Sequence, residues 1–178
     1  MRPFDLSPEG RRAIDDYLVG LVALFGAESI LEVVAGQPSA SPLAGADLVV
    51  CRDVRPRSTS RHDLERLAAS ARKVLVVFTG NGERVGAPSS AFRTCDIAPL
   101  LWAVGRVRDH AYFGLPAPVA ALVRWRRGGD LPGVLHAPVP TVVSRSAQLH
   151  AFVVDTTPRT PQARRRLRTM AEAREAGS

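Results

Sequence analysis

Two short apolar segments, joined by a stretch of loop-forming residues too short for a crossover helix, constrain the fold of this chain more than any other feature. Ile30–Val34 and Asp47–Cys51 are bounded by Gly and Pro, and apolar runs of this kind are typical of buried strands in a parallel sheet. Parallel strands are usually joined by a dozen or more residues that include a helix. The connection from Ala35 to Ala46 holds two prolines, two glycines and two serines. We therefore expect no helix there and a direct junction between the two strands.

Helix and strand signals alternate along the rest of the chain. A first helix is expected to begin at Ser7-Pro8, since Ser7 is a good cap and Pro8 suits the first turn, and to end at Gly26. Asp96 is predicted to cap a later helix, and Thr79–Gly82 reads as a turn. The further predicted helices are 60–72, 97–104 and 119–125, and the further predicted strands are 73–78, 109–113 and 150–155. The proline-rich segment 131–143 receives no assignment.

This alternation predicts an α/β fold with a mainly parallel sheet and helices on both faces. The segments Asp109–Phe113 and His150–Asp155 are expected to form an antiparallel pair at one edge of that sheet. The chain of 178 residues is long enough for one domain, which we place at residues 1–158. A basic helical tail is predicted over residues 159–178.

Composition narrows the class of protein. The chain is 46% hydrophobic and 23% charged, as in soluble globular proteins, and no apolar run reaches the ~18 residues of a membrane span. The N-terminal residues lack the apolar core of a signal peptide, so a cytoplasmic location is expected. Cys51 reads as a small core residue, and the histidines show no metal-ligand spacing. We expect neither a disulfide framework nor a metal site.

The net charge of +7 is carried almost entirely by arginine. Six arginines and two glutamates follow residue 158, so the tail alone has a net charge of +4. Arg164, Arg165, Arg166 and Arg168 are therefore candidates for contact with an acidic protein partner or a polyanion. Their alternative role is a solvated helix face.

The order of these elements resembles that of class I S-adenosylmethionine-dependent methyltransferases over roughly residues 8–158. Helix 8–25 with SILEVVAGQP is similar to the opening helix, first strand and glycine-rich loop of that family. ADLVVCRDV resembles its fourth strand, LERLAASARKVLVVFTGN its next helix and fifth strand, and DHAYFGLP and HAFVVDTTP its last two strands. The resemblance implies a Rossmann-like sheet. A surviving cofactor site would use Glu32 and Gly36, with Thr79 and Gly80 at the same edge of the sheet.

The chain departs from the family pattern at the cofactor loop. The family loop reads acidic-x-Gly-x-Gly-x-Gly, and here Glu32 and Gly36 match while Val34 and Pro38 replace the other two glycines. Side chains at those positions block close approach of the backbone to a ligand. The second and third strands of the family, with the carboxylate that binds the ribose, have no counterpart. Their loss leaves the first strand at a sheet edge, where unpaired backbone groups invite another chain.

Two residues are candidates for catalysis. Asp53 lies at the carboxyl end of a strand, where open α/β sheets bind ligands, and His110 lies beside Tyr112. Their alternative roles are structural: a loop aspartate that binds nearby amides, and a histidine on the strand surface. An arginine or amide partner is the structural alternative for Glu32.

The sequence therefore predicts a degenerate methyltransferase-like protein, a pseudoenzyme that has lost S-adenosylmethionine and acts as an interaction or structural subunit. A homodimer joined through the exposed sheet edge is one form of this role. One alternative is an active methyltransferase whose S-adenosylmethionine site is completed by a partner chain. A second is an arginine-rich protein associated with nucleic acid.

Overall fold

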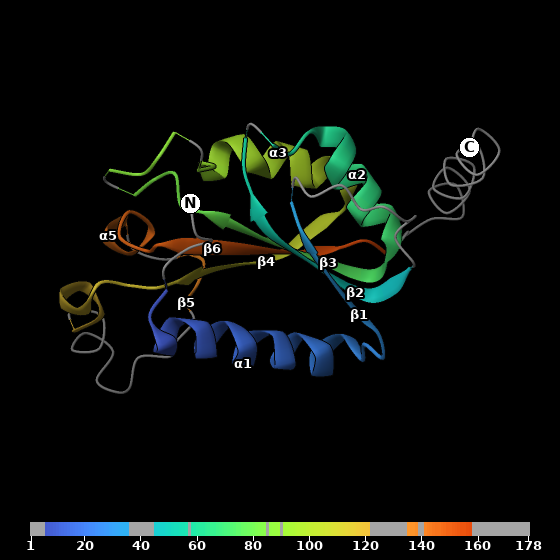
Figure 1. Ribbon diagram of the computed structural model, residues 1–178, viewed down its shortest axis with the longest axis horizontal. Helices are drawn as coiled ribbons and strands as arrows, with labels where there is room; N and C mark the ends of the chain where they lie inside the picture. The colour runs from blue at the N-terminus through green and yellow to red at the C-terminus, as the bar shows by residue number, and fades with distance from the viewer. Residues whose placement is uncertain are drawn as a thin grey trace.

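The computed structural model has three layers, with a six-stranded sheet between helices on its two faces (Figure 1). It describes residues 6–35, 45–56, 58–84, 86–89, 91–121, 135–138 and 141–157. Helix α1 (Pro8–Phe25) covers one face of the sheet, and α2 (Arg61–Ser70) and α3 (Thr94–Val104) cover the other. The predicted α/β class is confirmed.

The sheet is mixed rather than mainly parallel. Its strands are β1 (Ile30–Val34), β2 (Ala46–Val54), β3 (Ala71–Gly80), β4 (Arg106–Phe113), β5 (Leu135–His136) and β6 (Leu149–Asp155). In the order β1-β2-β3-β6-β4-β5, the two pairings among β1, β2 and β3 are parallel and the other three are antiparallel. The predicted mainly parallel character thus holds only for the β1–β3 half.

The predicted antiparallel pairing of the last two long strands is confirmed, but its place at the edge is wrong. Strand β6 lies inside the sheet, between β3 and β4. All seven of its residues are buried. A strand with apolar side chains on both faces is stable only where both faces and both edges are covered, which explains this central place.

Helix α1 is built as its sequence predicts. The Ser7 hydroxyl accepts the Gly10 amide at 3.1 Å, and Gly26 ends the helix with a left-handed φ of 55°. Ile14, Tyr17 and Leu21 are buried against the sheet. These residues fix α1 above β2, β3, β4 and β6, whereas β1 contributes nothing to the buried core on this face.

The helices of the opposite face begin and end differently from the sequence prediction. Helix α2 ends at Ser70, because Ala71 and Arg72 already pair as part of β3. Helix α3 begins at Thr94, three residues before the predicted start. The expected capping role of Asp96 is wrong: the residue at the cap is Arg93, and Asp96 lies within the first turn, where a negative charge is favourable.

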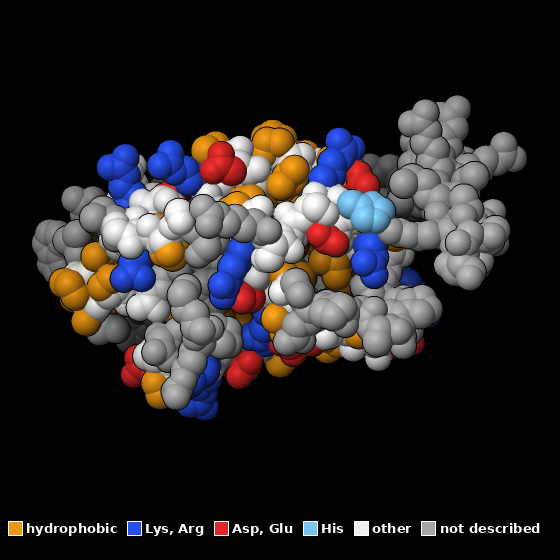
Figure 2. All heavy atoms as spheres, turned by 45° about the horizontal axis from the view of Figure 1, so that its top comes forward, with side chains coloured by type: hydrophobic (Ala, Val, Ile, Leu, Met, Phe, Trp, Pro, Cys, Tyr) orange, Lys and Arg blue, Asp and Glu red, His pale blue; other side chains and the backbone are white. Residues whose placement is uncertain are grey.

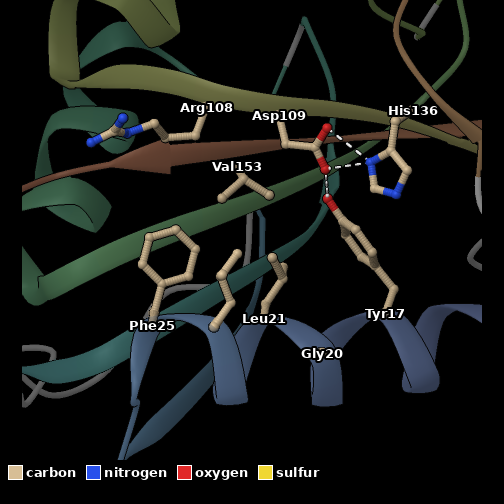
Figure 3. A pocket seen from close by; sticks show the side chains of 9 residues that line it. Tyr17, Gly20, Leu21, Phe25, Arg108, Asp109, His136 and Val153 are labelled. Atoms are coloured by element: carbon tan, nitrogen blue, oxygen red, sulfur yellow. Dashed lines mark hydrogen bonds and ion pairs between the residues drawn. The ribbon is translucent and has the colours of Figure 1, made fainter.

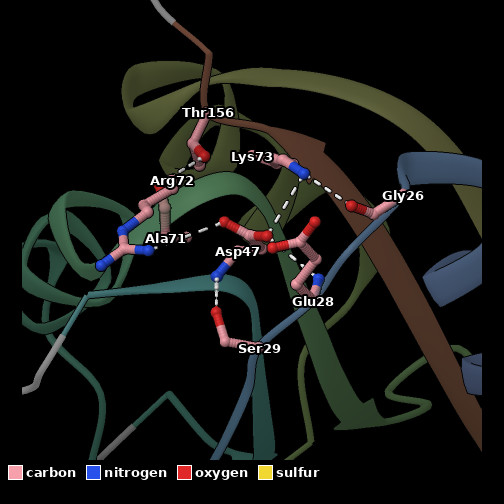
Figure 4. A network of polar contacts seen from close by, with 8 residues as sticks. All are labelled: Gly26, Glu28, Ser29, Asp47, Ala71, Arg72, Lys73 and Thr156. Atoms are coloured by element: carbon pink, nitrogen blue, oxygen red, sulfur yellow. Dashed lines mark hydrogen bonds and ion pairs between the residues drawn. The ribbon is translucent and has the colours of Figure 1, made fainter.

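Polar contacts join the amino-terminal ends of β2 and β3 to the turn after α1 (Figure 4). The Asp47 carboxylate accepts the Glu28 amide at 3.0 Å and lies 3.2 Å from the ammonium of Lys73, the single lysine of the chain. These bonds hold the pKa of Asp47 below its usual range. Lys73 also donates to the Gly26 carbonyl at 2.6 Å. The network therefore fixes the α1–β1 turn on the sheet, at the end opposite the candidate ligand-binding edge.

The proline-rich segment without a sequence assignment contains two short elements. Leu135–His136 pair with β4 as β5, and Thr141–Ser144 form a single helical turn, α5. Residues 117–121 are also helical. The predicted tail helix and its arginines lie outside the described residues.

Candidate functional site

Three of the predicted catalytic and cofactor-binding residues that the structure describes lie at the carboxyl ends of β2 and β3. Glu32 lies on β1, Asp53 is the penultimate residue of β2, and Thr79 and Gly80 end β3. The sheet therefore brings Asp53, Thr79 and Gly80 to one edge, whereas Glu32 lies in the middle of β1, opposite Val50. Gly36 lies outside the described residues.

The carboxylate of Glu32 forms an ion pair with the Arg52 guanidinium of the neighbouring strand. Arg52 in turn lies over the ring of Phe78, with 5.6 Å between the guanidinium carbon and the ring centroid. Both side chains are partly exposed, at 52% for Glu32 and 34% for Arg52. The structural alternative for Glu32, an arginine partner, is thus present in the fold.

The backbone of Asp53 adopts a conformation that is uncommon for residues other than glycine. Its φ is 61°, in the left-handed region that aspartate tolerates better than most residues, and the β2–β3 register shifts at this point. Its carboxylate accepts two bonds from Arg55, one from Nε at 2.8 Å and one from Nη2 at 2.6 Å. This bidentate pair fixes the Asp53 side chain beside Arg55 and occupies both of its carboxylate oxygens.

Thr79 and Gly80 are buried, and the predicted turn at this point is wrong for both. They continue β3, where they pair with His150 and Leu149 of β6. The Thr79 hydroxyl donates to the Val54 carbonyl at 2.7 Å. Neither residue therefore presents a polar group to solvent at the ligand-binding edge.

His110 lies far from Asp53 and belongs to a separate aromatic cluster. Strands β2 and β4 are separated by β3 and β6, which places the two residues about 14 Å apart across the sheet. The Nε2 atom of His110 is 3.1 Å from Nδ1 of His150, and its ring stacks on Phe152 at 4.1 Å. Burial lowers the pKa of His110 to about 4 and that of His150 to about 3, so both rings are neutral in the folded protein.

A polar cluster that the sequence does not reveal lies between α1 and the β4–β5 end of the sheet (Figure 3). The Asp109 carboxylate accepts the Tyr17 hydroxyl at 2.7 Å and contacts His136 Nδ1 at 2.8 Å. Burial and the nearby carboxylate raise the pKa of Tyr17 well above its usual value. A register shift in β4 just before Asp109 accompanies this arrangement.

No spacing rule finds this cluster, because its members come from a helix, a long strand and a two-residue strand. The only local signals are a carboxylate at the start of the predicted strand 109–113 and a tyrosine on the inward face of an amphipathic helix. Both also fit structural roles.

The described part of the chain carries balanced charge. It contains 13 Lys and Arg residues and 13 Asp and Glu residues, so the excess of +7 resides in the other residues. On the face that carries α2 and α3, basic side chains lie beside acidic ones (Figure 2). The arginines at 164–166 and 168, which were predicted to contact a partner or polyanion, lie outside the described residues.

The described residues lack two further kinds of feature. No helix among them is long and apolar enough to cross a bilayer. No group of three or more His, Cys, Asp or Glu residues among them is arranged to hold a metal ion.

No protein-family model matches this chain, and no curated protein matches it either.

Proposed function

We propose that this chain is a reduced methyltransferase-like domain that has lost the S-adenosylmethionine site and serves as an interaction subunit, pairing with a second copy of itself through β1. The observation that carries the proposal is the direct junction of β1 and β2. The two strands are parallel neighbours, and only 11 residues separate them. β1 is consequently the outer strand of the sheet.

The strand order supports the methyltransferase likeness. The segments that resemble the first and fourth strands of the family are neighbours, as that resemblance implies. The segments that resemble its last two strands form an antiparallel pair. A connection of 11 residues reaches about 36 Å when extended, enough to return along a strand but too short for an extra strand and helix.

The contacts of the residues predicted to form the site support the proposal that the cofactor site has been lost. Glu32, the residue in the family's acidic position, is neutralised by Arg52. Asp53 is held by Arg55, and Thr79 and Gly80 are buried. A cofactor at this edge would have to separate the ion pairs without the missing strands that bind the ribose.

The free edge of β1 has groups that suit pairing with another strand. The Ser29 carbonyl accepts the Leu48 amide at 3.1 Å, and the Ala35 amide donates to the Arg52 carbonyl at 2.8 Å. Because these bonds alternate along a strand, the backbone groups of Ile30, Glu32 and Val34 point away from β2. The side chains of Ile30 and Val34 are large apolar groups that remain 57% and 37% exposed.

A second copy of the chain fits this edge in one favoured register. Two antiparallel β1 strands related by a two-fold axis at Glu32 place Ile30 of one copy opposite Val34 of the other. This register uses all three outward-pointing residues of each strand, with about six backbone hydrogen bonds. It also covers the exposed apolar side chains, and each Glu32 keeps its own Arg52. The other edge strand, β5, has only two residues and offers less to pair with.

Light scattering during size-exclusion chromatography tests the proposal. We expect a dimer, and we expect the double variant Ile30→Lys/Val34→Lys to be monomeric because charged side chains on an edge strand oppose pairing. Trp102→Lys is the matched control, since Trp102 is an apolar side chain on α3 that is 67% exposed. This variant should remain dimeric. Far-UV circular dichroism verifies that all three proteins are folded. A wild-type monomer up to about 100 μM, or a dimer that survives the double substitution, would contradict the proposal.

A further inference from the structure

A groove on the α1 face of the sheet lies apart from the β1 edge and from the predicted cofactor residues. Its volume is about 420 Å³, within the range of small-molecule sites. Leu21 and Leu24 of α1 line one side of it, and Val153 of β6 lines the other (Figure 3). Because Arg108 and Asp109 of β4 also line it, we call it the α1–β4 groove.

The half of α1 that borders the groove exposes apolar side chains. In the first half of the helix, charged residues such as Arg12 and Asp16 are exposed, as is usual for the outer side of a surface helix. From residue 17 to residue 25 the helix has no charged residue. Contiguous exposed apolar surface of this kind marks a site of interaction. The exposed residues of this half are Val19, Gly20, Ala23 and Leu24.

Gly20 leaves space in the groove that a larger residue would fill. It lies inside α1 without a left-handed φ, and a Cβ atom added to it would meet no other described atom within 4 Å. The described fold therefore does not require glycine at this position. Glycine inside a helix is less favourable than alanine, so the helix would be more stable with a side chain there. Because Gly20 lines the groove, its missing side chain adds to the room for a ligand.

The charged groups that line the groove are already bonded within the protein. The Asp109 carboxylate accepts the Tyr17 hydroxyl at 2.7 Å, and its two oxygens lie 2.9 and 2.8 Å from His136 Nδ1. Arg108 donates from Nε and Nη2 to Asp155 at 2.9 and 2.7 Å. An ion that entered the groove would lose hydration and would find these groups bonded to one another. An uncharged ligand avoids that loss.

We propose that the α1–β4 groove binds a small uncharged molecule that is mostly hydrocarbon, packed over Gly20 and against Leu21, Leu24 and Val153. The wall from Tyr17 to Leu24 covers two turns of helix, which is about 10 Å. Burial of the exposed leucine and of the apolar part of the ligand drives binding. The bonded charges around the groove then disfavour an ion of either sign.

Three probes with the same chain and different charge test this selectivity. 1-Octanol, octylammonium and octanoate are titrated into the full chain at about pH 7.5, where both ions are charged, and binding is followed by the amide chemical shifts of the protein. We expect the alcohol to bind with a dissociation constant below about 1 mM and each ion to bind at least about tenfold more weakly. The largest shifts should occur at Gly20, Leu21 and Leu24.

Substitutions on α1 then locate the site. Gly20→Leu fills the groove from its own wall and should weaken octanol binding at least about tenfold. Ala23→Leu is the matched control, because Ala23 is exposed on the same helix but does not line the groove. This variant should keep the affinity within about twofold of wild type. Leucine is a good helix former, so circular dichroism should show wild-type helix content for both variants.

Three results would overturn the inference. The first is no shift of the groove residues with octanol up to about 2 mM. The second is an ion that binds as tightly as the alcohol. The third is wild-type affinity in Gly20→Leu, or an equal loss of affinity in Gly20→Leu and Ala23→Leu.

Discussion

At the scale of single residues, the buried histidine pair makes the stability of the fold depend on pH. Burial lowers the pKa of His110 to about 4 and that of His150 to about 3, from 6.5, and this effect outweighs the opposing charges of Glu83 and Asp109 near His110. Between about pH 6.5 and pH 4, these two histidines bind protons in the unfolded chain that they do not bind in the folded protein. The free energy of unfolding should therefore fall as the pH decreases from about 6.5 to about 4.

Urea denaturation at several pH values measures this dependence. Each buried histidine contributes at most about 1.4 kcal/mol per pH unit in this window. His150→Leu should remove one such contribution and flatten the curve. The same slope in wild type and His150→Leu would show that the pair is not the source of acid sensitivity.

At the scale of elements, the strands with continuous apolar runs could be predicted from the sequence. β1, β2, β3 and β6 are such strands, and their local composition agrees with their central or paired positions. Strand β4 begins three residues before the predicted start, because Arg106 and Arg108 interrupt the apolar pattern. In the folded protein the Arg108 side chain pairs with the carboxylate of Asp155 on the neighbouring strand.

The elements that could not be predicted from the sequence are stabilised by contacts with residues far away along the chain. Leu135 and His136 form a strand only through pairing with β4, so no local pattern announces them. The Tyr17–Asp109–His136 cluster depends on the same pairing. The common position of Asp53, Thr79 and Gly80, by contrast, follows from the rule that parallel strands share their carboxyl ends.

The Glu32–Arg52 pair provides an element-scale test of the proposed register. In that register the two Glu32 side chains face each other, and like charges in such positions oppose pairing. Arg52→Gln should weaken the dimer roughly fivefold, and Glu32→Gln/Arg52→Gln should restore it. Both variants lose the contact of Arg52 with Phe78, so their comparison isolates the charge. Equal dissociation constants from analytical ultracentrifugation would rule out this register.

At the scale of the whole molecule, the basic character and the folded domain are separate properties. The described residues carry as many acidic as basic side chains, so the excess of arginine lies elsewhere in the chain. Any attraction to nucleic acid or another polyanion is therefore expected from segments such as 159–178 rather than from the sheet and its helices. Among the described residues, the sheet offers an edge of β1 that no other described strand pairs with.

We propose that direct joining of β1 to β2 eliminates the position of the adenosyl group while leaving a stable domain. Isothermal titration calorimetry with S-adenosylmethionine tests it most directly, on the full chain with its fold verified by circular dichroism. We expect only heats of dilution up to about 1 mM cofactor. A dissociation constant in the micromolar range would contradict the claim and favour an active methyltransferase whose site a partner chain completes.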